Sequence, residues 1–125
     1  MTGRGTESDN HRPLALVAVE AAAGELRAAV VAQRAATADH GDFYALAGDI
    51  VDVLRALSSL AGVLGEQVAG YGRGRVLRDD AGQDPAVRLA DAAALLALVR
   101  EDLDGAERTA SRFWSEISHV AAEEA

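Results

Sequence analysis

Three arginines alternate with glycines in the segment 70–83, next to a tyrosine. Arg73, Arg75 and Arg78 supply guanidinium groups that can contact phosphate, and Tyr71 supplies a ring on which a nucleobase can stack. The chain has a net charge of −8, however, and contains no recognisable nucleic-acid-binding module. The favoured interpretation is a solvated loop whose arginines pair with acidic neighbours. Phosphate or nucleic-acid binding, in a plasmid-maintenance or transfer accessory, is the alternative.

Two pairs of carboxylates have a spacing that is compatible with metal binding. Asp49 with Asp52, and Glu101 with Asp104, lie three residues apart on two predicted helices. Facing carboxylate pairs hold Mg²⁺ in all-helical nucleotide pyrophosphatases, and Mg²⁺ prefers oxygen ligands. Both pairs lie off the apolar rows of their helices, where solvated side chains are expected. A small Mg²⁺-dependent nucleotide hydrolase is therefore a less favoured alternative.

Other catalytic arrangements find little support. Glu116 and His119 have the Glu-x-x-His spacing of di-iron helical bundles, but such a site needs a second copy of the motif, and the sequence has none. The histidines are far apart in the sequence, and the absence of cysteine excludes thiolate chemistry and disulfides. The sequence therefore predicts no catalytic residue, no metal site and no cofactor, and the protein is not expected to be an enzyme.

Apolar residues recur at helical spacing in three segments, which predicts helices over about 13–37, 43–69 and 84–122. The long row of the second segment is Phe43, Leu46, Ile50, Val53, Leu57, Leu60 and Leu64, and its flanking row is Ala47, Val51, Leu54, Ala61 and Val68. The row of the third segment is Leu89, Ala92, Leu96, Val99, Leu103, Ala106, Ala110, Phe113, Ile117 and Val120. Because the second segment has two adjacent apolar rows, its helix must contact two neighbours.

Turn and cap residues mark the predicted boundaries. Residues 1–12 are polar and lack periodicity, so they predict a disordered tail before a single domain over 13–125. Gly41 suits a turn with positive φ, and Asp42 is the predicted N-cap of the second helix. Asp84 followed by Pro85 is a strong start signal for the third helix.

Together these features predict an all-α fold, a long antiparallel helical hairpin plus a third helix. This is a three-helix bundle with coiled-coil-like packing, because the apolar rows alternate steps of three and four residues. Gly48 and Gly62 share one stripe of the second helix, and each costs about 1 kcal/mol relative to alanine in a helix. Close approach of another helix would offset that cost.

Phe113 and Trp114 are predicted contact residues near the end of the third helix. At about 1.5 Å per residue this helix exceeds about 50 Å, so its C-terminal end is expected to project. Trp114 shares a stripe with the polar residues Arg100 and Glu107, and tryptophan is enriched in binding hot spots. The alternative is that Trp114 folds against the first helix or the loop 70–83. The favoured function is a non-enzymatic helical interaction protein that associates with itself or with a helical partner.

Three stretches carry a family resemblance: Tyr71-Gly-Arg-Gly-Arg75, Asp84-Pro85 with Arg88-Leu89-Ala90, and Ile117-Ser118-His119. Over about 43–119 they resemble small, functionally uncharacterised all-helical proteins of high-GC actinomycetes, some of them encoded near plasmid-type or transfer genes. The resemblance implies an all-helical, non-enzymatic protein and supplies no catalytic motif.

Charge and hydropathy give expectations about location. The chain has 20 acidic residues against 12 arginines, which disfavours contact with nucleic acid and anionic membranes. Its first residues lack an apolar signal-peptide core, and no run of about 18 uncharged apolar residues occurs. A cytoplasmic protein without membrane insertion is expected.

Overall fold

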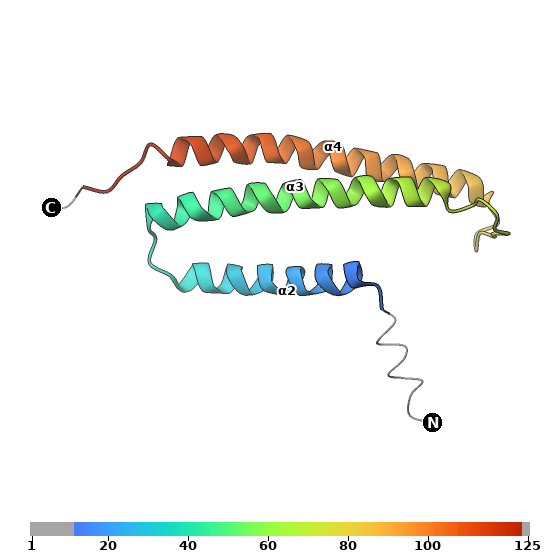
Figure 1. Cartoon of the computed structure of the whole chain (residues 1–125), viewed down its shortest axis with the longest axis horizontal. Helices are drawn as coiled ribbons and strands as arrows, with labels where there is room; N and C mark the ends of the chain where they lie inside the picture. The colour runs from blue at the N-terminus through green and yellow to red at the C-terminus, as the bar shows by residue number, and fades with distance from the viewer. Residues whose placement is uncertain (1–11, 124–125) are drawn as a thin grey trace, which may run out of the picture. The chain divides into compact units, whose positions relative to one another are not determined.

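The computed structural model describes residues 12–123, which form three α-helices and no strand (Figure 1). The helices are α2 (Leu14–Ala35), α3 (His40–Gly70) and α4 (Pro85–Ile117). The predicted all-α class is confirmed. The predicted tail falls mainly on residues 1–11, which lie outside the described part of the chain.

The chain divides into two compact units, with the boundary between Ala38 and Asp39. In the second unit α3 and α4 pack side by side as a long antiparallel hairpin (Figure 1). At about 1.5 Å per residue, 31 residues of α3 and 33 of α4 give helices of about 46 and 50 Å. The two helices thus have nearly equal length, and the prediction that the end of α4 projects beyond its neighbour is wrong.

Contacts between α3 and α4 follow a simple register. A step of seven residues forward along α4 matches a step of seven back along α3. The contacts are Arg100 with Gly62, Glu107 with Arg55, and Trp114 with Gly48. Gly48 and Gly62 therefore face large side chains of α4, which fill the room that the glycines leave. The expected close approach of another helix backbone at these glycines stays a prediction.

The face of α3 that packs on α4 consists of small residues. Ala47, Val51 and Ala61 are buried, together with one polar residue, Ser58. Ala47, Val51 and Ala61 belong to the predicted flanking row, whereas four members of the long row remain partly exposed: Leu46, Ile50, Leu57 and Leu64. The face toward α4 is thus the one whose small residues leave room for the side chains of Trp114 and Arg100.

Only one side of the predicted row of α4 is covered. Leu89, Leu96, Leu103, Ala110 and Ile117, which lie seven residues apart, are half-buried along the whole helix. The members between them turn outward, since Val99, Phe113 and Val120 are 45–52% exposed and Ala106 is exposed. The half-buried positions near the C-terminal end of α4 are Glu107, Ala110, Ser111, Trp114 and Ile117.

The predicted N-cap is confirmed for α4 but not for α3. Asp84 accepts a hydrogen bond from the Ala86 amide at 3.0 Å, and Pro85 opens α4 as expected. The N-cap of α3 is Asp39, not Asp42, and Gly41 lies inside the helix. Asp39 caps the helix because its carboxylate accepts hydrogen bonds from the amides of Gly41 and Asp42 at 3.1 and 3.3 Å. Helix α4 ends at Ile117, five residues before the predicted end at 122.

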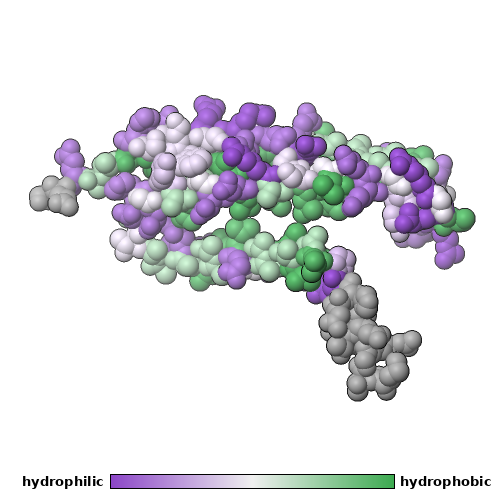
Figure 2. Space-filling view, in the orientation of Figure 1, coloured by the Kyte–Doolittle hydropathy of each residue, from purple (hydrophilic) through white to green (hydrophobic). Residues whose placement is uncertain are grey.

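Helix α2 forms the ordered part of the first unit. Pro13 precedes its first turn as predicted, and Arg12, which was assigned to the tail, pairs with Glu20 at 2.5 Å. None of its side chains is buried. Figure 2 shows hydrophobic residues along most of its length, and its predicted apolar row includes Leu16, Val19, Leu26 and Val30, which are 42–52% exposed.

Candidate functional site

One partly exposed apolar feature of the hairpin is a row on α3, which we call the α3 row. It consists of Phe43, Leu46, Ile50, Val53, Leu57, Leu60 and Leu64. Leu46, Ile50, Leu57 and Leu64 are 38–48% exposed, and the other three are half-buried. Between Leu46 and Leu64 the row spans about 27 Å of helix. Exposed apolar surface of this extent is typical of interaction sites.

Trp114 belongs to the contact between α3 and α4. A Cβ atom on Gly48 would lie only 3.0 Å from Cζ2 of the indole, and the indole centroid is 5.8 Å from that of Tyr44 at an interplanar angle of 52°. Trp114 therefore packs against the second predicted helix, which neither of the two sequence interpretations anticipated. Phe113 is 49% exposed, so the structure separates these neighbouring residues.

A shallow hollow of about 280 Å³ lies beside Trp114. It is lined by Tyr44, Ser111, Trp114, Ser115 and Ser118. The indole Nε1 is buried without an acceptor among the described groups. Among the described residues the contacts of Trp114 are therefore those of its ring.

A polar layer crosses the middle of the hairpin. Ser58 donates a hydrogen bond to Oδ1 of Asp104 at 2.5 Å, and Nε of Arg55 donates to Oε1 of Glu107 at 2.8 Å. Arg100 lies over Gly62, where an added Cβ would be 2.8 Å from its Nη1. Gly62 leaves room for Arg100, and the two hydrogen bonds pair specific positions of α3 and α4, so the layer helps to fix the register of the two helices.

The residues considered for metal chemistry are not brought together. Asp104 is bonded to Ser58, while Asp49 and Asp52 are exposed. Across residues 12–123 no three His, Asp or Glu side chains gather closely enough to hold a metal ion. Glu116 and His119 are likewise exposed, and His119 lies beyond the end of α4.

The loop between α3 and α4 uses Tyr71 and Arg75 for contacts of its own. The guanidinium of Arg75 lies 4.3 Å from the ring centroid of Tyr71, and its Nη1 donates to the Tyr71 carbonyl at 2.9 Å. Arg73 lies against the end of α3 at Gly70, and Arg78 lines a shallow hollow with Leu77. One face of the predicted base-stacking ring is thus covered by an arginine of the same loop, while Tyr71 remains 50% exposed. Phosphate binding by Arg73 and Arg78 stays a prediction.

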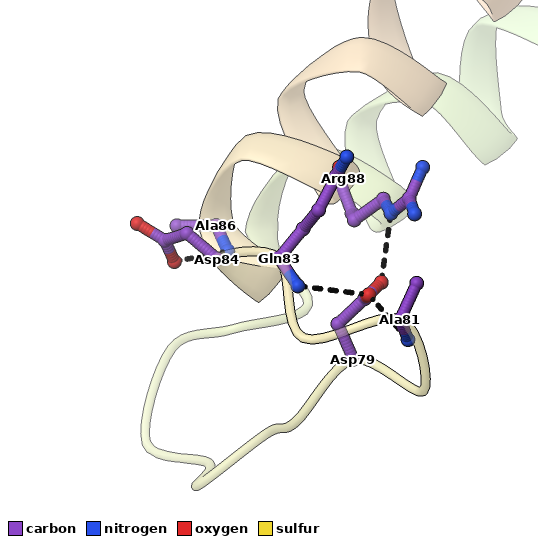
Figure 3. A network of polar contacts seen from close by, with 6 residues as sticks. All are labelled: Asp79, Ala81, Gln83, Asp84, Ala86 and Arg88. Carbon is purple, nitrogen blue, oxygen red and sulfur yellow. Dashed lines mark hydrogen bonds and ion pairs between the residues drawn. The ribbon is translucent and has the colours of Figure 1, made fainter.

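Asp79 organises the second half of this loop (Figure 3). Its Oδ1 accepts from Nε of Arg88 at 2.7 Å, and its Oδ2 accepts the amides of Ala81 and Gln83 at 2.8 and 3.1 Å. The hydrogen bond from Arg88, followed by the Gln83 amide, lowers the pKa of the Asp79 carboxyl. Gly82, with φ of 77°, allows the tight turn between these contacts.

Sequence reasoning missed several of these structural roles. Asp79 and Arg88 were not singled out, because no periodicity links a loop carboxylate to a residue nine positions later on a helix. The stripe of Arg100, Glu107 and Trp114 was noted, but its polarity suggested solvent. The matching seven-residue spacing of Gly62, Arg55 and Gly48 was the signal that could have placed this stripe against α3.

The chain matches no protein-family model, no curated protein and no solved structure. None of the three described helices combines the length and apolarity that a membrane span requires.

Proposed function

We propose that this chain is a non-enzymatic helical interaction protein that binds another helix along the α3 row. The observation that supports the proposal is the exposure of Leu46, Ile50, Leu57 and Leu64 on a helix whose adjacent, smaller row already packs on α4. Helix-in-groove and helix-pair recognition use apolar anchors at this spacing of three and four residues.

Energetics favour a partner for this row. Removing apolar surface from water stabilises by about 25 cal/mol per Å², and a leucine contributes about 1.5–3 kcal/mol when it is fully buried. Four half-exposed aliphatic side chains on one face thus retain a substantial part of that driving force. Leu16, Val19, Leu26 and Val30 of α2 supply further exposed apolar surface in the other unit.

A pair of matched variants tests the proposal. Leu57→Asp places a charge in the middle of the α3 row, whereas Leu98→Asp places the same charge on α4, where Leu98 is 54% exposed. Leu57→Asp is expected to weaken association at least about tenfold, which corresponds to about 1.4 kcal/mol, and Leu98→Asp to leave association unchanged. Light scattering after size-exclusion chromatography measures the association.

Thermal unfolding of the same variants distinguishes binding from folding. If the α3 row serves a partner, dilute samples of Leu57→Asp and Leu98→Asp should unfold at similar temperatures. A much lower unfolding temperature for Leu57→Asp alone would mean that the row is covered within the chain. That result would contradict the proposal.

A further inference from the structure

We infer that the tip of the loop between α3 and α4 binds the surface of an anionic phospholipid membrane. The tip consists of residues 71–78, Tyr71-Gly-Arg-Gly-Arg-Val-Leu-Arg78, and Figure 1 shows this loop at one end of the hairpin. Its three arginines suit lipid phosphates, and Val76 suits the boundary between headgroups and acyl chains. The inference concerns a surface other than the α3 row and is independent of the proposed function.

The acidic residues that follow the tip do not neutralise it. Asp79 accepts hydrogen bonds from Arg88 with one carboxylate oxygen and from backbone amides with the other, and Asp84 caps α4. In the part of the chain that the structure describes, no ion pair includes an arginine of the tip. The remaining carboxylate of the loop is that of Asp80, which is exposed. The tip therefore presents three guanidinium groups to a partner.

A fully exposed apolar side chain lies among these charges. Val76 is 103% exposed, more than any other large hydrophobic residue that the structure describes. Tyr71 is 50% exposed, and tyrosine suits a boundary where one end of the side chain is apolar and the other wet. A membrane interface can bury these side chains while the neighbouring guanidinium groups contact lipid phosphates, and both terms strengthen binding.

Contacts within the loop hold the tip in shape before it binds. Arg75 donates to the Tyr71 carbonyl at 2.9 Å, and Gly74, with φ of 70°, turns the chain beside it. Leu77 is half-buried and lines a shallow hollow together with Leu89 of α4. A surface that is ordered before binding loses little conformational freedom on binding.

The size of the tip favours a membrane over a protein or nucleic-acid partner. A specific protein interface uses about 20–30 residues on each side, whereas the tip has eight. Single-stranded nucleic acid binds on aromatic faces, and Arg75 already covers one face of Tyr71. A lipid surface needs no complementary shape, and it alone gives the exposed Val76 an apolar environment.

The net charge of −8 does not prevent this contact. Interactions between exposed charges are largely screened beyond about 8 Å at physiological ionic strength. Helices α3 and α4 have 31 and 33 residues, so they extend about 46 and 50 Å from the tip. The acidic residues in the middle and at the far end of the hairpin therefore lie outside the range in which they could repel the membrane.

Co-sedimentation of the full chain with lipid vesicles tests the inference. Vesicles of phosphatidylcholine and phosphatidylserine should bind the chain at least about tenfold more tightly than vesicles of phosphatidylcholine alone, and added salt should weaken the binding. Arg73→Gln/Arg78→Gln should lower the affinity for the anionic vesicles at least about tenfold. The control Arg108→Gln/Arg112→Gln removes the same charge from exposed positions of α4 and should leave the affinity unchanged.

Single substitutions test the two other parts of the contact. Val76→Ser should weaken binding at least about threefold, because the interface gains less from burying the smaller polar side chain. Val99→Ser, on α4, is its control, since Val99 is 45% exposed. Asp80→Asn removes the opposing charge of the loop and should strengthen binding about threefold.

Absence of binding to the anionic vesicles would overturn the inference, as would an equal loss of affinity in the two double arginine variants. An affinity of Val76→Ser equal to that of the parent would overturn the apolar contact with the membrane. A gel shift with nucleic acid, in the absence of vesicle binding, would replace the membrane by a nucleic-acid partner. None of these results bears on the α3 row, which Leu57→Asp tests separately.

Discussion

The two apolar faces of α3 differ in the size of their side chains. The face toward α4 is built from alanine, valine, serine and glycine, and its members Ala47, Val51 and Ala61 are at most 6% exposed. The α3 row consists of a phenylalanine, one valine and larger aliphatic side chains, and Ile50 is still 48% exposed. If hydrophobicity alone decided which face is buried, the α3 row would be buried in preference to the face toward α4.

This difference in side-chain size indicates that the fit to α4, and not hydrophobicity, determines which face of α3 is buried within the hairpin. Glycines on α3 leave room for Trp114 and Arg100 of α4, while Tyr44 and Arg55 of α3 contact Trp114 and Glu107 from the sides of this face. Close packing of this kind resembles the interdigitation of large and small residues in protein cores. The larger aliphatic residues of the α3 row are left for a different neighbour.

The strongest test of the α4-facing contact is Trp114→Ala. Truncation of a fully buried tryptophan costs about 3–5 kcal/mol, and since Trp114 is half-buried we expect a loss of about 2–3 kcal/mol in the free energy of unfolding. Urea unfolding followed by circular dichroism measures the loss. Trp114→Phe should retain most of the stability, because Nε1 has no acceptor to lose. Equal stability of the alanine variant and the parent would remove Trp114 from the hairpin contact.

Paired glycine substitutions sharpen the comparison. In Gly65→Ala the new methyl group would contact only Leu96 Cβ, at 3.8 Å. The higher helix propensity of alanine should therefore raise the free energy of unfolding by up to about 1 kcal/mol. In Gly48→Ala the new methyl group would lie 3.0 Å from the indole of Trp114, which Tyr44 also contacts. We expect Gly48→Ala to be less stable than Gly65→Ala by about 1–2 kcal/mol. The reverse order in chemical unfolding would contradict the close approach at Gly48.

A smaller effect is expected from Ser58→Ala. The variant loses the hydrogen bond to Asp104, and because the carboxylate can be rehydrated at the surface the cost should be about 1 kcal/mol. Ser59→Ala, an exposed neighbour, is the matched control and should be neutral. Equal unfolding curves for the two variants would show that the polar layer does not stabilise the hairpin.

The loop contact of Asp79 should respond to acid while both faces of α3 stay unchanged. Its pKa is lowered in the folded chain, so its contribution is present above the ordinary pKa of an aspartate and is lost as the pH falls through the lowered value. NMR titration should show the Ala81 and Gln83 amides shifting together at a pH below the ordinary pKa of an aspartate. Asp79→Asn should abolish this transition. A titration of these amides that is unchanged in Asp79→Asn would assign it to another group.

Sequence reasoning identified the helices and one precise boundary, because the helical spacing and the Asp84-Pro85 cap are local signals. It could not choose between the two apolar rows of α3, since that choice depends on the shape of α4. It also placed Phe113 in the helix contact and Trp114 outside it. The polar residues Arg100 and Glu107, which share the stripe of Trp114, suggested that this stripe faces solvent, whereas both residues face α3. Its candidate loop residues are present, but Tyr71 and Arg75 are engaged with each other.

The most direct test of self-association through the α3 row is the mass of the unmodified protein in solution. Light scattering coupled to size-exclusion chromatography at two protein concentrations measures it. Self-association predicts a species with twice the mass of one 125-residue chain, with its share increasing at the higher concentration. The mass of a single chain at both concentrations would contradict it.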